Sequence, residues 1–407
     1  MRKFAIAAVW CLSVALAACG GGGGSSSDTS TSASSSGTPS APVSSTPATP
    51  VQNTMSVSVG PNAYRIANSL SASVTICVPG TSNCQTIDNV LVDTGSYGLR
   101  LMASAVTLPL PKVSAAAGGT LATCAAFGTG TTYGSVATAD IKLAGEVASS
   151  APVQIIADPT VGTSPADCTN QGVGDLNTAQ ALGSNGILGV GLESVDCGPG
   201  CVVNTYPTSP AYFGCTSAIS CVPTTVALAD QVTNPVSMFS TDNNGVLVQL
   251  PAVPTSGSQS LTGTLTFGIG TQTDNGLGSA TVYTDSLSTQ YKGVTYSTSF
   301  IDSGSNALFF EDPSITQCSG SSTFYCPLSN TALSAVMTGA NGNNTSLNFS
   351  IGNFTTMASG GAYAMSALGG YSSSYFDWGL PFFYGRTIYT AIDGKSTPGG
   401  TGPYYAF

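Results

Sequence analysis

The segments Asn89-Val-Leu-Val-Asp93-Thr-Gly-Ser96 and Ser299-Phe-Ile-Asp302-Ser-Gly-Ser305 decide the fold of this chain. Each carries apolar residues and ends in Asp-Thr/Ser-Gly-Ser. The wide separation lets each segment serve its own lobe, while one aspartate from each meets the other in a shared cleft. Two carboxyl groups in contact share one proton, which leaves one of them as an acid and the other as a base.

The composition excludes most other kinds of active site. The chain has no histidine, which removes the usual general base, the Ser/His and Cys/His nucleophile pairs and most zinc sites. Nine Lys and Arg residues stand against nineteen Asp and Glu residues, so the formal net charge is −10. We therefore expect no nucleic-acid partner, no metal and no cofactor.

The N-terminus predicts export. Residues 1–18 combine Arg2 and Lys3 with an apolar run, as in a signal peptide. Leu16-Ala-Ala-Cys19 resembles a bacterial lipobox, which implies cleavage before Cys19 and its lipidation; the alternative is that Cys19 is an ordinary thiol of the signal region. By the same resemblance Gly20 favours the outer membrane. Residues 19–54 are rich in Gly, Ser, Thr and Pro, which predicts a disordered tether.

Ten cysteines follow Cys19, an even number that favours five disulfides in an oxidising compartment. The sequence does not dictate their pairing. Short separations favour four pairs and leave Cys124 for Cys168: the four are Cys77 with Cys84, Cys197 with Cys201, Cys215 with Cys221, and Cys318 with Cys326.

Short alternating runs separated by turn residues predict a mostly β chain with few helices. Its length favours two β lobes, over residues 55–235 and 236–407, because one simple sandwich is smaller. Asn234-Pro235 interrupts the chain, and we expect Val236-Ser-Met-Phe239 to begin a new strand. The glycines from Gly186 to Gly191 lack the lysine and helix of a phosphate loop. The Asp-Asn-Gly segments are interpreted as turns rather than calcium loops.

These motifs resemble the pepsin-like aspartic peptidases over most of residues 60–395. The Asp93 and Asp302 segments resemble the two active-site loops of that family. In the first half, Thr132-Tyr133-Gly134-Ser135 resembles the flap, and Asn185-Gly-Ile-Leu-Gly-Val-Gly191 resembles the apolar segment behind the first loop. In the second half, Met238-Phe239-Ser240 and Gly263 to Gly268 resemble strands of the second lobe, and Trp378 to Asp393 resembles the closing run. The resemblance implies a bilobal acid-protease fold with the active-site cleft between two β-barrel-like lobes. The chain also resembles a group of proteobacterial lipoproteins of unknown function.

The resemblance implies a role for each residue of the two loops. Asp93 and Asp302 are the expected catalytic pair, and the alternative is that they only cap turns. The expected supporting residues are Thr94, Gly95, Ser96, Ser303, Gly304 and Ser305. Glycine permits a sharp turn and a close approach, the Thr94 and Ser303 hydroxyls reach the opposite loop, and each following serine bonds its own aspartate.

Tyr133 and Gly134 are the expected flap over the substrate, and the alternative is a hairpin tyrosine that packs on its sheet. Two positions depart from the family pattern. Arg100 stands where the family has a tryptophan, and we expect it to favour the charged aspartates or to bind an acidic ligand group. Pro381 stands where the second apolar segment normally has its glycine.

The main hypothesis is an aspartic endopeptidase that cuts extended polypeptide, acts as a monomer and is held at the cell envelope by its lipid. The substrate is expected to bind as an added β-strand. The second hypothesis is a catalytically silent pepsin-like module that binds peptide or glycan at the envelope. The third is a structural lipoprotein without a ligand.

Overall fold

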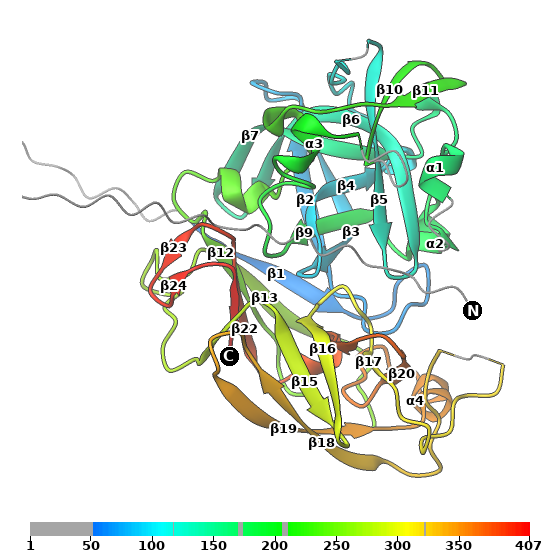
Figure 1. Cartoon of the computed structure of the whole chain (residues 1–407), viewed down its shortest axis with the longest axis vertical. Helices are drawn as coiled ribbons and strands as arrows, with labels where there is room; N and C mark the ends of the chain where they lie inside the picture. The colour runs from blue at the N-terminus through cyan, green and yellow to red at the C-terminus, as the bar shows by residue number, and fades with distance from the viewer. Residues whose placement is uncertain (1–51, 117, 170–173, 206–210, 321–322) are drawn as a thin grey trace, which may run out of the picture. The chain divides into compact units, whose positions relative to one another are not determined.

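The computed structural model describes residues 52–116, 118–169, 174–205, 211–320 and 323–407 (Figure 1). The predicted signal peptide, Cys19 and nearly all of the predicted tether lie outside these residues. The predicted all-β fold is confirmed, since the described α-helices are short: α1 Ala166–Thr169, α2 Ala179–Leu182, α3 Gly200–Val203 and α4 Phe354–Ser359. Within the described residues, no helix is long and apolar enough to cross a bilayer.

The strands form two large sheets and one hairpin. The larger sheet has sixteen strands: β1 Thr54–Val59, β2 Ser71–Cys77, β3 Cys84–Asp93, β4 Tyr97–Met102, β5 Thr120–Phe127, β6 Gly130–Leu143, β7 Glu146–Ile156, β8 Gly174–Asp175, β9 Gly186–Val190, β10 Tyr212–Ser217, β11 Ser220–Pro223, β12 Gly245–Gln249, β13 Leu261–Phe267, β14 Val282–Thr284, β22 Thr387–Ala391 and β25 Tyr404–Ala406. The second has seven: β15 Leu287–Tyr291, β16 Val294–Ile301, β17 Leu308–Phe310, β18 Thr331–Thr338, β19 Asn344–Ile351, β20 Gly369–Tyr371 and β21 Phe376–Trp378. The hairpin consists of β23 Ser396–Thr397 and β24 Gly400–Thr401.

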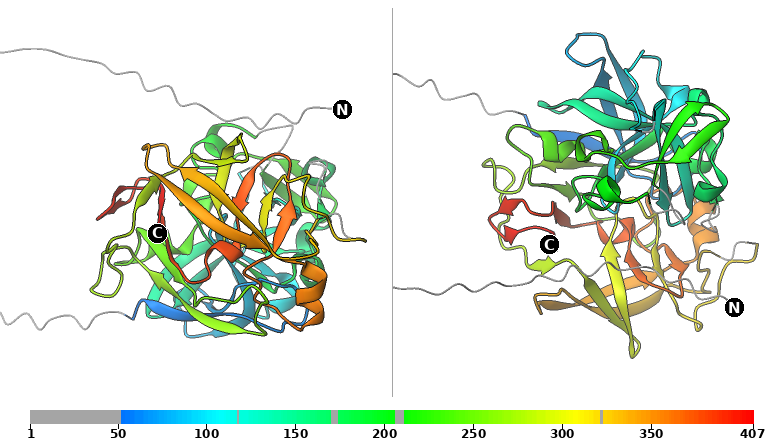
Figure 2. Two further views of the ribbon diagram at one scale, coloured as in Figure 1. Left: turned by 90° about the horizontal axis from the view of Figure 1, so that it is seen from below. Right: turned by 45° about the horizontal axis from the view of Figure 1, so that its top comes forward.

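The chain forms two lobes joined by the larger sheet. Strands β2 to β11 gather in one lobe and the strands after β13 in the other, as the blue-to-green and yellow-to-red ribbons show (Figures 1 and 2). Strand β1 pairs with β13 from Thr54↔Thr266 to Val59↔Leu261, and meets β2 only at Ser58↔Ser71. Strand β1 therefore belongs to the part of the larger sheet that joins the two lobes. For the residues after β1, we propose residue 235 as the boundary between the lobes.

The same local arrangement surrounds each of the two aspartates. In the first half, β3 runs into Asp93 with β9 parallel beside it, and β4 leaves the loop antiparallel to β9. In the second half, β16 runs toward Asp302 with β21 parallel beside it, and β17 leaves antiparallel to β21. The register places Asp93 opposite Gly189 and Ile301 opposite Trp378, so the residue that corresponds to Gly189 is Gly379.

This register corrects the expectation for Pro381. The glycine of the second apolar segment is not replaced by Pro381, because Gly379 occupies its place two residues earlier. A Cβ atom on Gly379 would lie 2.2 Å from the carbonyl oxygen of Ala307, so only glycine fits against the loop. Pro381 instead lies in the 3-10 helix η5 Leu380–Phe382.

The expected strand at residues 236–239 is wrong. Residues Pro235–Met238 form the 3-10 helix η4, and the Asn234 side chain accepts a hydrogen bond from the Val236 amide at 3.1 Å. Proline at the first helical position fixes φ there, and asparagine is a favoured cap, so the Asn-Pro pair begins a helical turn.

All five predicted disulfides are present: Cys77–Cys84, Cys124–Cys168, Cys197–Cys201, Cys215–Cys221 and Cys318–Cys326. Four of them close short loops, with Cys77 and Cys84 facing each other across the β2–β3 pair. Five disulfides are typical of a protein that folds in an oxidising compartment.

A buried asparagine fastens the segment before β2 to the second lobe. Asn68 is fully buried, and its amide donates to the carbonyl oxygens of Asn306 at 2.8 Å and Met365 at 2.9 Å. Its side-chain oxygen accepts from the Met365 amide and the Tyr384 hydroxyl, each at 2.7 Å. Asn306 directly follows Ser305, so this contact fixes the end of the second aspartate loop.

Two carboxyl groups are in contact next to the turn of the β6–β7 hairpin. Glu146, which is 2% exposed, hydrogen-bonds to Asp242, which is fully buried. Burial, together with the Asp242 carboxyl, raises the pKa of Glu146 from its ordinary 4.5 to about 7. Asp242 also accepts from the Thr271 hydroxyl. Because the folded state holds this proton more tightly than the unfolded chain, the pair stabilises the fold in acid.

We expect wild-type protein to lose stability relative to Glu146→Gln as the pH rises from 4.5 to about 7. Below 4.5 the proton is bound in both states and the contribution is fully present, whereas above 7 it is lost. The expected difference is on the order of 1–2 kcal/mol. Denaturant unfolding at several pH values measures it, with exposed Glu311→Gln as the control. Parallel stability curves for wild type and Glu146→Gln would contradict the shared proton.

Candidate active site

Asp93 and Asp302 lie together at the junction of the lobes. Asp93 is the last residue of β3 and is 5% exposed, and Asp302 follows β16 and is half-buried. Their side chains are in hydrogen-bonding contact. Because two ionised carboxylates repel each other at this range, the pair is stable when it holds one proton.

The glycine after each Asp-Thr/Ser pair allows this contact. A Cβ atom on Gly95 would lie 2.5 Å from Cγ of Asp302, and one on Gly304 would lie 2.5 Å from Oδ1 of Asp93. Each loop therefore presses its glycine against the carboxyl group of the other loop, and a side chain at either position would push the aspartates apart.

The second residues of the two loops exchange hydrogen bonds. The Thr94 amide donates to the Ser303 hydroxyl at 3.1 Å, and the Ser303 amide donates to the Thr94 hydroxyl at 2.9 Å. The Ser303 hydroxyl in turn donates to the carbonyl oxygen of Val92 at 2.8 Å. Thr94 is 1% exposed and Ser303 is fully buried, so water does not compete for these bonds. They hold the two loops in register.

Each aspartate is oriented by donors of its own loop. Asp93 Oδ1 accepts from the amides of Gly95 at 2.9 Å and Ser96 at 3.1 Å, and its Oδ2 accepts from the Ser96 hydroxyl at 2.6 Å. Asp302 Oδ1 accepts from the Gly304 amide at 2.7 Å, and its Oδ2 accepts from the Ser305 hydroxyl at 2.9 Å. All eight residues of the two predicted loops therefore meet in one site.

The environment assigns the shared proton to Asp93. Burial and the neighbouring Asp302 raise the pKa of Asp93 well above its ordinary value, although the Ser96 hydroxyl and the Gly95 amide oppose the rise. The site therefore favours a proton on Asp93, as expected when two carboxyl groups are in contact.

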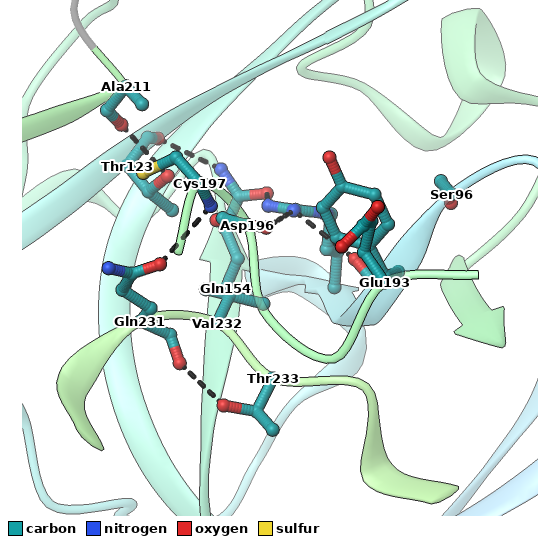
Figure 3. Close-up of polar contacts among 12 residues, drawn as sticks. Ser96, Thr123, Gln154, Glu193, Asp196, Cys197, Ala211, Gln231, Val232 and Thr233 are labelled. Carbon is teal, nitrogen blue, oxygen red and sulfur yellow. Dashed lines mark hydrogen bonds and ion pairs between the residues drawn. The ribbon is translucent and has the colours of Figure 1, made fainter. Parts of the chain in front are cut away.

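Arg100 does not face the aspartates, which corrects the expectation for this residue. It is 3% exposed, forms an ion pair with Asp196 and donates to Gln154 Oε1 at 3.1 Å. Gln154 and Asp196 lie side by side in this network (Figure 3). The Tyr212 hydroxyl also donates to Asp196, at 2.7 Å. Because the Arg100 charge is buried and paired, it cannot bind an acidic ligand group.

The tip of the β5–β6 hairpin packs on Arg100. The Arg100 guanidinium lies 6.0 Å from the ring centroid of half-buried Phe127, the last residue of β5. Thr132 in β6 bonds the same Gln154 oxygen at 2.9 Å. Phe127 was not among the predicted residues. The Phe-Gly-Thr-Gly turn between two alternating runs was the available signal.

Tyr133 is a core residue, and its assignment to a flap is wrong. It is 1% exposed, its ring packs edge-on to Phe213 with centroids 5.8 Å apart, and its hydroxyl lies 3.2 Å from the sulfur of Cys215. The alternative given for Tyr133 in the sequence analysis, a hairpin tyrosine that packs on its own sheet, is correct. Gly134 faces β7, where a Cβ atom would lie 1.9 Å from the carbonyl oxygen of Ile155.

A third carboxyl group, Asp377, lies beside the pair. It is 2% exposed, contacts the Ser305 hydroxyl and stands in β21 directly behind Asp302. The sequence analysis did not identify it, although a lone carboxylate between Phe376 and Trp378 in an apolar run was a usable signal.

The lobes, the paired loops and the parallel strand behind each of them define a protein with a pepsin-like fold. The chain belongs to the family described as "Protein of unknown function (DUF3443)", whose model matches residues 49–407. No curated protein matches the chain. Among solved structures, it is similar to the aspartic proteinase from Irpex lacteus, with 17% identity and a TM-score of 0.49, over 87% of this chain and 96% of that one.

We expect Arg100→Met to destabilise the protein by about 3–5 kcal/mol, because it leaves the buried Asp196 carboxylate without its cation. Adding Asp196→Asn to that variant is expected to restore most of the loss, since no buried charge remains and Tyr212 keeps an acceptor. Denaturant unfolding measures both, with exposed Lys142→Met as the control. Additive losses in the double variant would contradict the pairing.

Proposed function

We propose that this protein is an aspartic endopeptidase that hydrolyses peptide bonds with a water molecule activated between Asp93 and Asp302. The observation that carries the proposal is the contact between these two carboxyl groups, in which burial and the neighbouring Asp302 favour the protonated form of Asp93. The crossed Thr94 and Ser303 bonds support it, because they give the pair the rigidity that positioned catalysis requires.

The proposed reaction is general acid and base catalysis. The Asp302 carboxylate takes one proton from the water, the resulting hydroxide adds to the scissile carbonyl carbon, and Asp93 gives its proton to the carbonyl oxygen. The tetrahedral intermediate then collapses: Asp302 passes its proton to the leaving nitrogen, the C–N bond breaks, and Asp93 recovers its proton from the intermediate. No covalent enzyme intermediate forms.

We propose that the substrate is an extended polypeptide and that the enzyme acts as a monomer at the bacterial cell envelope. An extended strand is a suitable ligand for a mostly β protein, because its backbone bonds to strands and alternate side chains enter pockets. The disulfides support an oxidising compartment. Anchoring by a lipid on Cys19 in the outer membrane is part of the proposal and rests on the sequence alone.

The competing proposal is a pepsin-like module that binds peptide or glycan without cleaving it. Its expected recognition residue was Arg100, which is buried and paired with Asp196. The complete set of loop residues around Asp93 and Asp302 favours catalysis instead. A structural lipoprotein would have no need of these contacts.

We expect the purified protein to cleave members of a diverse peptide library, and Asp93→Asn or Asp302→Asn to lower kcat/KM by roughly 10²–10⁴-fold. Asp88→Asn, an exposed carboxylate on the same strand as Asp93, is the matched control and is expected to leave cleavage unchanged. Folded, disulfide-bonded protein that cuts no peptide but binds some of them would favour the silent module.

We expect cleavage to depend on pH with a maximum on the acidic side. At low pH the pair binds a second proton and loses its base, and activity falls again as the pH rises through the raised pKa of Asp93. Initial rates for one peptide from pH 2.5 to 8, with folding checked at each pH, measure the profile. A rate that keeps rising above neutral pH would contradict an acid role for Asp93.

A further inference from the structure

The carboxyl group of Asp377 is buried behind the second aspartate loop. Asp377 is the middle residue of β21, opposite Phe300 of β16 and Phe309 of β17. One of its oxygens, Oδ1, is fully buried and has no hydrogen-bond partner. The carboxyl group otherwise contacts the Ser305 hydroxyl, the same hydroxyl that donates to Asp302 Oδ2 at 2.9 Å.

The fold does not require a carboxyl group at this position. In the first lobe the corresponding place beside Leu91 of β3 is held by Ile187, which is also 2% exposed. The two lobes therefore share this parallel strand pairing. The first lobe has an apolar residue at the position where the second lobe has an acid. A buried acid without a structural partner costs stability, so its position beside the reactive pair points to a role there.

The position of the Ser305 hydroxyl hydrogen determines which group donates in the contact between Asp377 and Ser305. A serine hydroxyl has one hydrogen, and the Ser305 hydrogen is given to Asp302. The contact between Asp377 and Ser305 is therefore a hydrogen bond only if Asp377 is the donor, which requires a protonated carboxyl group. The chain of bonds then runs from Asp377 through Ser305 to Asp302.

The surrounding charges favour this protonated form. The groups that act on Asp377 are the carboxyls of Asp302 and Asp93, and the hydroxyls of Tyr375 and Tyr405 also lie within its field. In the described part of the chain no lysine or arginine forms an ion pair with it. Burial and the two aspartates raise the pKa of Asp377 well above its ordinary value, although the Ser305 contact opposes the rise.

We propose that Asp377 is a positioning residue that, in its protonated form, donates to Ser305 and so directs the Ser305 hydroxyl onto Asp302. The kinetic effect of this role rests on the proposed peptidase function, whereas the protonation of Asp377 does not depend on that function. If Asp377 ionised, it would compete with Asp302 for the single Ser305 hydrogen and add a second negative charge beside the pair.

The first test is spectroscopic and independent of cleavage. Infrared difference spectra of full-length Asp93→Asn protein at pH 6, with and without added Asp377→Asn, report whether a protonated carboxyl group disappears with Asp377. A protonated-carboxyl component that is lost with Asp377→Asn supports the proposal, and identical protonated-carboxyl bands in the two proteins, to which Glu146 contributes equally, overturn it. A protein that cleaves nothing would refute the peptidase proposal and leave this result unaffected.

The second test uses kinetics at the pH of maximal activity. Asp377→Asn keeps a donor for Ser305, and we expect kcat/KM within about threefold of wild type. Asp377→Leu, which has no donor, is expected to lower kcat about tenfold with KM little changed, as for loss of one hydrogen bond. Thermal unfolding checks that both variants fold.

A double-variant experiment tests whether Asp377 acts through Ser305. Ser305→Ala is expected to lower kcat as much as Asp377→Leu, and the double variant no further, because both changes break the same chain of bonds. Equal activity of Asp377→Leu and wild type, or fully additive losses in the double variant, would overturn the proposal.

Discussion

The reciprocal hydrogen bonds between Thr94 and Ser303 are the contact on which the rest of this structure depends. Each loop gives one amide and one hydroxyl to the other, so neither loop is satisfied alone. Both residues are buried, and an unpaired amide or hydroxyl at this position would cost the free energy of its lost hydration. The lobes must therefore close until the loops touch, and only glycine at positions 95 and 304 leaves room for the opposing carboxyls.

Three buried carboxyl groups of this protein are stabilised by protons and hydroxyls rather than by cations. Asp93, Glu146 and Asp377 each have a pKa above its ordinary value, and each contacts another acid or a serine. These three groups stabilise the folded state in acid, because it holds their protons more tightly than the unfolded chain does. Three other carboxyl groups with little exposure, those of Asp158, Asp196 and Asp312, are paired with Lys112, Arg100 and Lys292.

In the first lobe, Arg100 and Asp196 form an ion pair in which both side chains are nearly buried, at 4% and 9% exposed. Burial raises the pKa of Asp196, and the Arg100 guanidinium and the Tyr212 hydroxyl counteract that rise. The pair fastens β4 to the segment after β9, and Arg100 also packs against Phe127 near the tip of the β5–β6 hairpin. Because Arg100 is paired with Asp196, its charge is not free to interact with Asp93 and Asp302.

The sequence alone predicts the all-β class, the two aspartate loops and the four short-range disulfides, because each of these features depends on residues close together in the chain. In the loops, Asp93 bonds to residues two and three positions later, and Asp302 repeats this geometry. Which residues face which neighbours depends on how distant segments pack against one another. This packing buries Tyr133 in its sheet, gives Arg100 a partner 96 residues away, aligns Gly379 with the second loop and places Asp377 behind Ser305. Strand register and burial depend on pairing between distant segments, and local composition does not encode them.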